Sequence, residues 1–241
     1  MATIDDLKQI RLDKLNKLRE LGIDPYPATV KREQTIKQAK GLDGKPVAIA
    51  GRIMALRGHG KIIFADLSDE SGRIQIAFKA DKIEEKIFKL LEFLDIGDFI
   101  AVQGDVGKTQ AGEISIFATN FTIITKSLRP LPEQGYGLKD IEERYRKRYL
   151  DMLINPEVHK RLEIRSKIIQ AICDFLTKKG FIEVETPSLQ PIYGGGFARP
   201  FKTHHNALDA DFYLRISDEM YLKRLIVGGF EKVFEITKVF R

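Results

Sequence analysis

Three features near the end of the chain could hold a charged substrate. The triplet Gly194–Gly196 would let backbone approach a ligand closely and adopt positive φ. Glu219 would sit in the first turn of a helix for which Ser217 is a plausible N-cap, where a carboxylate favours the positive helix end. Arg241 offers a planar, permanently charged fork that suits phosphate, although a terminal arginine is usually a frayed surface charge.

A second group of residues could contact nucleic acid. Phe64 and Gln75 fall on neighbouring predicted strands, which a turn at Ser71-Gly72 would pair. A phenyl ring can stack on a base, and a carboxamide can read a Watson–Crick edge by donating and accepting together. The alternative is that Phe64 and Phe78 belong to the core and that Gln75 is a solvated strand residue. Basic residues beside them are Arg57, Lys61 and Arg73.

Residues 45–126 must position this second group, and their composition predicts strands. The strands are Val47–Leu56, Lys61–Leu67, Arg73–Phe78, Phe99–Gly104 and Glu113–Ile124. A helix over Asp81–Leu94 is predicted after the third strand, with its apolar residues on one face. Three strands, a helix and two further strands is the order of an OB-fold barrel, a fold that binds single-stranded nucleic acid.

Helices and a linker flank the predicted barrel. Residues 3–22 have helical spacing of apolar residues, with cations that either form a solvated face or rest on nucleic-acid phosphates. Those cations are Lys8, Arg11, Lys14, Lys17 and Arg19. Residues 127–139 contain two prolines and two glycines and are predicted to be a linker. A short helix over Ile141–Leu153 and a long helix from Pro156 to Lys179 follow.

The composition narrows the class of protein. A net charge of +6 favours a polyanionic partner. The single cysteine, Cys173, excludes an internal disulfide framework and is expected to be a small core residue among apolar neighbours. No apolar run approaches the roughly 18 residues needed to span a bilayer, and the N-terminus lacks an apolar signal core. We therefore expect a soluble, cytoplasmic protein without a membrane partner.

The order of elements in residues 181–241 resembles the opening half of a class II aminoacyl-tRNA synthetase catalytic domain. A long helix leads into a strand ending at Thr186-Pro187, which matches the first class signature. The segment GGGFARPF, then HHNALD, is similar to a loop of the lysyl-tRNA synthetase branch. The run FEITKVFR, ending at Arg241, matches the first strand of the second class signature.

The resemblance implies roles for particular residues. Gly194, Gly195 and Gly196 would meet bound lysine, and Glu219 would bind its α-ammonium group. Arg241 would grip the α-phosphate of ATP while a carboxylate attacks it. Pro187 would lie in a homodimer interface and help to couple two active sites. The cofactors implied are ATP and Mg²⁺, with the Mg²⁺ ligands expected beyond residue 241.

The run GRIMALRGHGKIIFADLSDESGRIQIAF is similar to the anticodon-binding barrel shared by lysyl-, aspartyl- and asparaginyl-tRNA synthetases. In that family an aromatic ring stacks on the central anticodon uridine and a glutamine reads its edge. Phe64 and Gln75 occupy those motif positions, and Arg57 matches a nearby basic position. The resemblance therefore favours the nucleic-acid role over the core and solvated alternatives for these residues.

The chain also departs from the family pattern. Tyr193 stands where proline is usual and Gly196 where alanine is usual, and Ser217-Asp218 replaces Ala-Pro. The changes at Tyr193 and Gly196 affect the stiffness of the loop. The change at Ser217-Asp218 leaves the first residue of the following helix undetermined. The adjacent His204 and His205 lack neighbouring carboxylate or cysteine ligands, so no metal site is expected there.

These resemblances predict an α+β protein: an N-terminal helix and lead-in (1–44), a five-stranded OB-fold anticodon-binding domain (45–126), a linker (127–139) and a partial class II antiparallel-sheet catalytic domain (140–241). The implied function is that of the N-terminal part of a lysine–tRNA ligase, whose partners are lysine, tRNA and a second copy of itself. Since the chain covers only about the first half of a typical family member, we expect it to be inactive alone. The alternative is a non-catalytic tRNA- or RNA-binding module.

Overall fold

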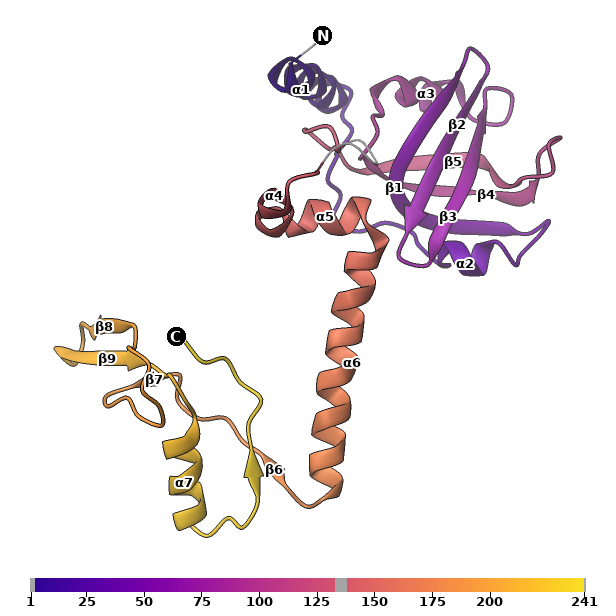
Figure 1. Ribbon diagram of the computed structural model, residues 1–241. Coiled ribbons are helices and arrows are strands. Elements are labelled where there is room, and N and C mark those ends of the chain that lie inside the picture. Colours follow the sequence, from indigo (N-terminus) through magenta and orange to yellow (C-terminus); the bar gives the residue numbers. More distant parts are fainter. Residues whose placement is uncertain (1–2, 133–137, 241) are drawn as a thin grey trace. The chain divides into compact units, whose positions relative to one another are not determined.

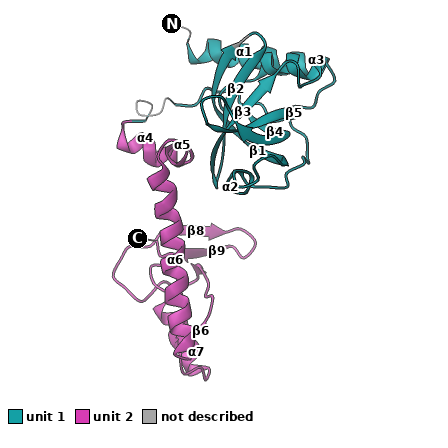
Figure 2. Cartoon of the chain, turned by 90° about the vertical axis from the view of Figure 1, so that its right-hand side faces the viewer, with its two compact units in different colours: residues 1–138 teal, residues 139–241 magenta. Residues whose placement is uncertain are grey.

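The computed structural model describes residues 3–132 and 138–240. The chain divides into two compact units, residues 1–138 and 139–241 (Figure 2). No helix in the described ranges combines the length and the apolar character that crossing a membrane requires.

The first unit is a five-stranded barrel with short helices around it (Figure 1). Its elements are α1 (Ile4–Glu20), α2 (Ile36–Ala39), β1 (Pro46–His59), β2 (Ile62–Asp69), β3 (Gly72–Lys79), α3 (Glu85–Lys89), the 3₁₀ helix η1 (Leu90–Phe93), β4 (Phe99–Lys108) and β5 (Ile114–Thr125). The strands pair in the closed order β1-β2-β3-β5-β4, in which only β3 and β5 run parallel. The predicted OB-fold order is confirmed.

Alternate residues of the strands point into the barrel and make an apolar core. Phe78 is fully buried and meets Phe121 edge to face, with 5.3 Å between ring centroids. The alternative that Phe78 is a core residue is therefore correct. At Gly104 a Cβ atom would lie 2.2 Å from the carbonyl oxygen of Phe117, so only glycine permits the close approach of β4 to β5 there.

The helix predicted over Asp81–Leu94 is shorter than expected. The amide of Lys82 donates to the carbonyl oxygen of Lys79 in a turn, and helix begins only at Glu85. After α3 the chain tightens into η1. The apolar residues still reach the core from this broken segment, because Ile83, like Leu94, is no more than 5% exposed.

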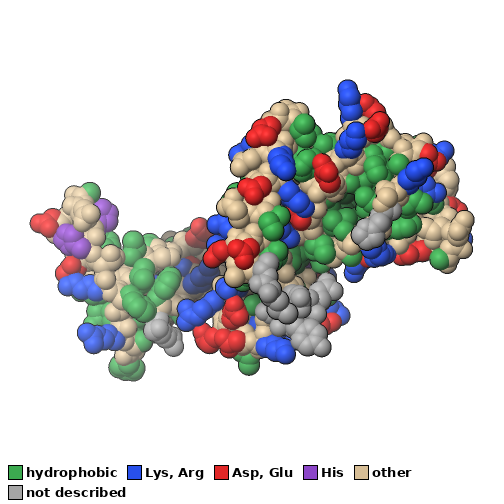
Figure 3. Space-filling view, turned by 90° about the horizontal axis from the view of Figure 1, so that it is seen from above, with side chains coloured by type: hydrophobic (Ala, Val, Ile, Leu, Met, Phe, Trp, Pro, Cys, Tyr) green, Lys and Arg blue, Asp and Glu red, His purple; other side chains and the backbone are tan. Residues whose placement is uncertain are grey.

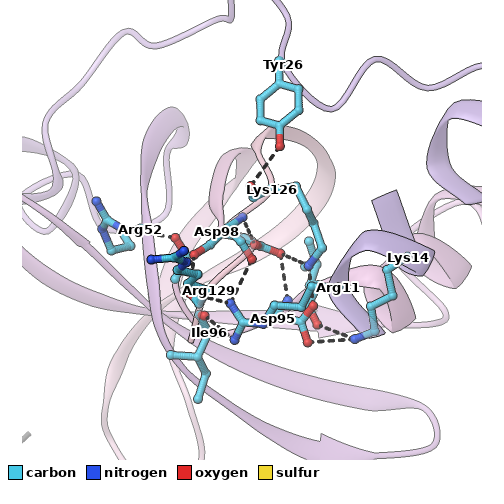
Figure 4. Close-up of polar contacts among 12 residues, drawn as sticks. Arg11, Lys14, Tyr26, Arg52, Asp95, Ile96, Asp98, Lys126 and Arg129 are labelled. Atoms are coloured by element: carbon cyan, nitrogen blue, oxygen red, sulfur yellow. Dashed lines mark hydrogen bonds and ion pairs between the residues drawn. The ribbon is translucent and has the colours of Figure 1, made fainter. Parts of the chain in front are cut away.

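Helix α1 is attached to the barrel by one of its cations (Figure 4). The Arg11 guanidinium is almost completely buried and donates three hydrogen bonds to backbone carbonyl oxygens. The acceptors belong to Ile96 (3.1 Å), Ser127 (2.9 Å) and Arg129 (3.1 Å). Arg11 is thus neither solvated nor available to phosphates, and both sequence interpretations are wrong for it.

A buried lysine completes the attachment (Figure 4). Lys126 Nζ is fully buried, lies 2.7 Å from Asp98 and also pairs with Asp95. Lys14 pairs with Asp95 at 2.8 Å, so this second cation of α1 is also committed to the barrel. Burial pulls the pKa of Asp95 up, but Lys126 and Lys14 outweigh burial and the net shift is downward.

The second unit combines one long helix, α6 (Pro156–Lys178), with short helices and strands that are shorter than those of the barrel. Its elements are α4 (Ile141–Arg146), α5 (Arg148–Ile154), α6 (Pro156–Lys178), β6 (Ile182–Glu183), β7 (Leu189–Gln190), β8 (Lys202–His205), β9 (Ala210–Leu214), α7 (Glu219–Val227) and β10 (Val233–Phe234). Strands β7, β9 and β8 form an antiparallel sheet, and β6 pairs in parallel with β10. The predicted strands ending at Pro187 and at Arg241 are reduced to two paired residues each.

The single helix predicted over Ile141–Leu153 is divided into α4 and α5. The backbone of Lys147 leaves helical geometry, with φ of −109° and ψ of 48°. The carboxylate of Asp151 stabilises the corner, because it is fully buried and accepts from Arg144, Arg148 and Asn155 at 2.7–3.0 Å. Buried carboxylates need such partners, so Asp151 fixes the angle between the two helices.

The second unit exposes many large apolar side chains, visible as open green surface in Figure 3. On α6 they are Leu162, Ile164, Ile168, Ile172 and Phe175, each at least 45% exposed. Spacings of four, four and three residues from Ile164 to Phe175 place four of them along one stripe. Cys173, on the same helix, is half-buried rather than a core residue.

Candidate functional site

A groove of about 480 Å³ lies over β1, β2, β3 and β5 and the loop between β4 and β5. It contains Arg57, Phe64 and Gln75, the three residues predicted to contact nucleic acid. Strand register explains their meeting, because Arg57 is opposite Phe64 and Gln75 is opposite Asp66. Phe64 and Asp66 are two residues apart on β2 and share a face. The barrel therefore presents the predicted set together.

The carboxamide of Gln75 is held in one orientation. Its Oε1 accepts a hydrogen bond from the buried Ser115 hydroxyl at 2.9 Å, and its Nε2 donates to Glu113 Oε2 at 2.9 Å. Gln75 is 7% exposed, so it is not the solvated residue of the alternative interpretation. One Nε2 hydrogen remains to meet a ligand. Sequence reasoning missed Ser115 and Glu113, which reach Gln75 only through the pairing of β3 with β5.

Arg57 is also pre-positioned. Its guanidinium donates two parallel hydrogen bonds to Asp66, at 2.9 and 3.0 Å, and Arg73 donates to the same carboxylate at 2.7 Å. Burial pulls the pKa of Asp66 up, but the two arginines outweigh burial and lower it overall. The bond to Asp66 in turn raises the pKa of Arg57. A permanent cation therefore stands beside Phe64.

Two aromatic rings contribute to the groove. Phe64 is half-buried, which leaves part of its ring open to a ligand. Phe117, on β5, has the ammonium of Lys79 4.9 Å from its ring centroid. Sequence reasoning did not select Phe117, which lies in a strand that is otherwise core-forming. An open ring, a fixed carboxamide and flanking cations together can stack a base, hydrogen-bond its edge and attract its phosphates.

In the second unit the glycine loop meets the start of α7. Gly195 has a φ of +80°, and a Cβ atom there would lie 2.8 Å from Ser217 Oγ and 3.2 Å from Glu219 Cβ. A side chain would thus clash as well as strain the backbone. Gly194 lies against Met220, and Gly196 lies near Ile216. The structure therefore brings the three glycines and Glu219 together.

Glu219 is the first residue of α7. The N-cap position is Asp218, which makes no side-chain cap, so the prediction of Ser217 as N-cap is wrong. Ser217 Oγ nevertheless accepts a hydrogen bond from the Glu219 amide at 3.1 Å. The Glu219 carboxylate is paired with Lys223 Nζ at 2.6 Å, and both side chains are about half exposed or more. A carboxylate that already holds an ammonium group can hold another of the same kind.

Two predicted residues lie apart from this cluster. Pro187 is exposed, and its carbonyl oxygen accepts from Gln190 at 3.2 Å. Arg241 lies outside the described residues. Its neighbour Phe240 is tied to the cluster, because the Phe240 amide donates to the carbonyl oxygen of Arg215 at 2.9 Å.

The histidine pair has acidic neighbours, contrary to the sequence expectation. His204 lies 3.4 Å from Asp209 and 3.5 Å from Asp211, across the hairpin of β8 and β9. The expectation failed because antiparallel register pairs His204 with Asp211. Lys202 also binds Asp211, at 2.6 Å, so this exposed carboxylate already has a cationic partner.

Two family models match the chain. Residues 47–124 match an OB-fold nucleic acid binding domain. Residues 140–241 match tRNA synthetases class II (D, K and N). These matches confirm the predicted fold class, an OB-fold followed by the start of a class II synthetase domain.

Curated proteins named lysine–tRNA ligase align with almost all of the chain. The protein from Carboxydothermus hydrogenoformans is 53% identical over 99% of this chain and 50% of its own length. The proteins from Syntrophomonas wolfei and Moorella thermoacetica are 53% and 51% identical, over 99% and 98% of this chain and 49% of their own lengths. The chain spans about half the length of the curated relatives it matches. The resemblance to the lysyl branch is confirmed.

Proposed function

Because the chain belongs to the class II lysyl-tRNA synthetase family, we propose that its protein is a lysine–tRNA ligase. The reaction joins lysine to ATP as lysyl-adenylate and then passes lysine to the 3′ end of tRNA. Such a reaction needs placement of two charged substrates and neutralisation of developing charge, without a protein nucleophile. The observation that carries the proposal is the seating of Gly195 on Ser217 and Glu219 within the class II region.

In the proposed ligase, Glu219 binds the α-ammonium of lysine and the glycine triplet contacts the substrate backbone. Lys223 supports the first assignment, since its ammonium already lies 2.6 Å from that carboxylate. Gly195 supports the second, since it leaves the space beside Glu219 free of a side chain. Lysine would then displace Lys223 from a weak, solvent-exposed ion pair.

The family implies ATP and Mg²⁺ as the other components of the reaction. Arg241, outside the described residues, would bind the α-phosphate with its planar fork. Glu219 is assigned to an ammonium group, so we assign no Mg²⁺ ligand in the cluster around it. When bound, Mg²⁺ would neutralise phosphate charge.

The groove on the barrel would receive the tRNA anticodon. Phe64 stacks on a base, Gln75 donates to its edge through the free Nε2 hydrogen, and Arg57 contributes positive charge. The buried bonds to Ser115 and Glu113 favour this role, because they fix the carboxamide before the ligand arrives. In a cytoplasmic homodimer, the second subunit would cover the apolar stripe of α6, with Pro187 at the same interface.

A second candidate is a non-catalytic RNA-binding module. The contrast between the units favours it: the barrel has a complete apolar core, whereas the second unit exposes large side chains such as Phe175 and Ile192. In that case the groove would bind tRNA and no lysine would be activated.

The two candidates are separated by lysine-dependent ATP–pyrophosphate exchange, measured in the full-length protein together with binding of lysine tRNA. A ligase exchanges pyrophosphate only when lysine is present, and Glu219→Gln should raise the lysine KM at least about tenfold. Glu231→Gln, at an exposed carboxylate, is the matched control and should change nothing. Binding of tRNA without exchange would reject the ligase and leave the module.

A further inference from the structure

Arg215, at the end of β9, is a buried arginine whose side chain connects separate segments. It is 5% exposed, and its Nη1 lies 2.7 Å from Glu235 and 3.0 Å from the carbonyl oxygen of Thr186. Its Nε donates to the carbonyl oxygen of Lys238 at 3.1 Å, and its Nη2 donates to the Thr237 hydroxyl. All three guanidinium nitrogens therefore make hydrogen bonds, and their partners lie in two separate segments of the chain.

These contacts replace a sheet. Residues 184–187 and 235–240 are not assigned to any strand, although β6 and β10 lead into them. The main chain of Arg215 binds both sides as well: its amide donates to Ser188 and its carbonyl oxygen accepts from Phe240, each at 2.9 Å. One residue thus contacts both of these unpaired segments, as far as Phe240.

Arg215 is also close in sequence to the lysine cluster. Ser217, two residues later, touches Gly195 and accepts the amide of Glu219. Any movement of Arg215 would therefore shift the start of α7 relative to residues 235–240. The same residue positions both proposed substrate sites.

We propose that Arg215 is a positioning residue that fixes the spacing between Glu219 and the segment 235–240. The inference rests on the proposed ligase function, in which one end of this span holds lysine and the other leads to the α-phosphate contact. The attack of the lysine carboxylate requires both reactants to be aligned. A misplacement of about 1 Å can cost on the order of 100-fold in rate.

The substitution Arg215→Lys tests the fork rather than the charge. Lysine can still pair with Glu235, but a single ammonium cannot also reach the acceptors on Thr186, Thr237 and Lys238. Arg146→Lys is the matched control, because Arg146 forms an exposed pair with Glu142 in the same unit. Thr237→Val is a milder second variant that removes one acceptor and leaves the buried ion pair.

The experiment measures exchange kinetics in the full-length protein, lysine affinity by calorimetry, and folding by circular dichroism at the assay temperature. For Arg215→Lys we expect kcat to fall about 100-fold while lysine affinity changes less than about threefold. For Thr237→Val we expect a fall in kcat of about tenfold with the same pattern. A purely structural arginine would instead lower activity only in proportion to the unfolded fraction.

Wild-type kcat in both folded variants would overturn the inference, as would a loss confined to lysine affinity. If Arg215→Lys does not fold, the Thr237→Val result decides alone. Absence of exchange in the wild-type protein would reject the ligase function itself. The wild type therefore tests the proposed function, and the two variants test the role of Arg215.

Discussion

In the barrel, every strand pairs with two neighbours, and Arg57, Phe64 and Gln75 take their places from that register. In the second unit, β6 and β10 pair over two residues each. There Gly195 lies against Ser217 and Glu219, and the side chain of Arg215 bonds the segments around Thr186 and Glu235. A groove on a closed ladder is rigid before its ligand arrives. A site held by a few side-chain contacts depends on each of them, so a single substitution can change its geometry.

The largest effect should come from the buried lysine of the barrel. Lys126→Ala would leave the buried Asp98 carboxylate without its cationic partner, and we expect a loss of about 3–5 kcal/mol in the free energy of unfolding. Lys89→Ala, in an exposed pair with Glu85, is the control and should leave the free energy of unfolding nearly unchanged. Urea denaturation of both variants measures the difference. Equal losses in the two variants would mean that the buried pair of Lys126 with Asp98 contributes no more to stability than the exposed pair.

A smaller effect is expected at the groove. Removing the ring in Phe64→Ala should weaken binding of an anticodon stem-loop by about 1–3 kcal/mol, the usual contribution of base stacking. Phe175→Ala, which truncates an exposed ring in the second unit, should leave that affinity unchanged. Fluorescence titration with the labelled stem-loop gives both values. Wild-type affinity in Phe64→Ala would contradict the proposal that the barrel groove binds the anticodon.

Acid should lower the free energy of unfolding of both units, by less than the loss expected for Lys126→Ala. Burial raises the pKa values of Asp95 and Glu235, but their partners outweigh burial and the net shift of each is downward. A lowered folded pKa contributes stability above the unfolded value, about 4, and that stability is lost as pH falls through the folded pKa.

Urea midpoints at pH 7, 5 and 3 should therefore be similar at the first two values and lower at the third. Asp95→Asn should flatten the pH dependence of barrel unfolding and leave that of the second unit intact. A barrel midpoint that falls with pH as steeply in Asp95→Asn as in the wild type would contradict the assignment.

The smallest effect should follow Lys223→Met. The pair of Lys223 with Glu219 spans one helical turn at the surface, and such pairs contribute only about 0.3–0.5 kcal/mol. Thermal denaturation should show a shift of no more than a few degrees. A shift as large as that of Lys126→Ala would show that the second unit depends on its surface ion pairs as much as the barrel depends on its buried one.

Much of the barrel could be predicted from the sequence because its signals are local. Alternation of apolar residues and the turn at Ser71-Gly72 identify paired strands, and pairing alone puts Phe64 and Gln75 on one face. Glu113, 38 residues from Gln75, could not be assigned, since its contact depends on a parallel pairing with no local pattern.

The second unit was harder to predict for a related reason. The strand-like composition around β6 and β10 does not reveal that their pairing is confined to Ile182–Glu183 and Val233–Phe234. Arg215, just after β9, looks like an ordinary polar residue, and only its partners 20 to 29 residues away distinguish it. The family motif drew attention to Glu219, whereas Arg215 carried no such signal.

The bonds of Arg11 also affect how the barrel can be isolated. A protein shortened to begin at β1 would keep all five strands, yet it would lose the guanidinium that satisfies the backbone of Ile96, Ser127 and Arg129. Unmet carbonyl groups would then border the exit towards the linker. A shortened barrel that keeps these bonds therefore has to start upstream of α1, and a deletion that removes Arg11 should destabilise it.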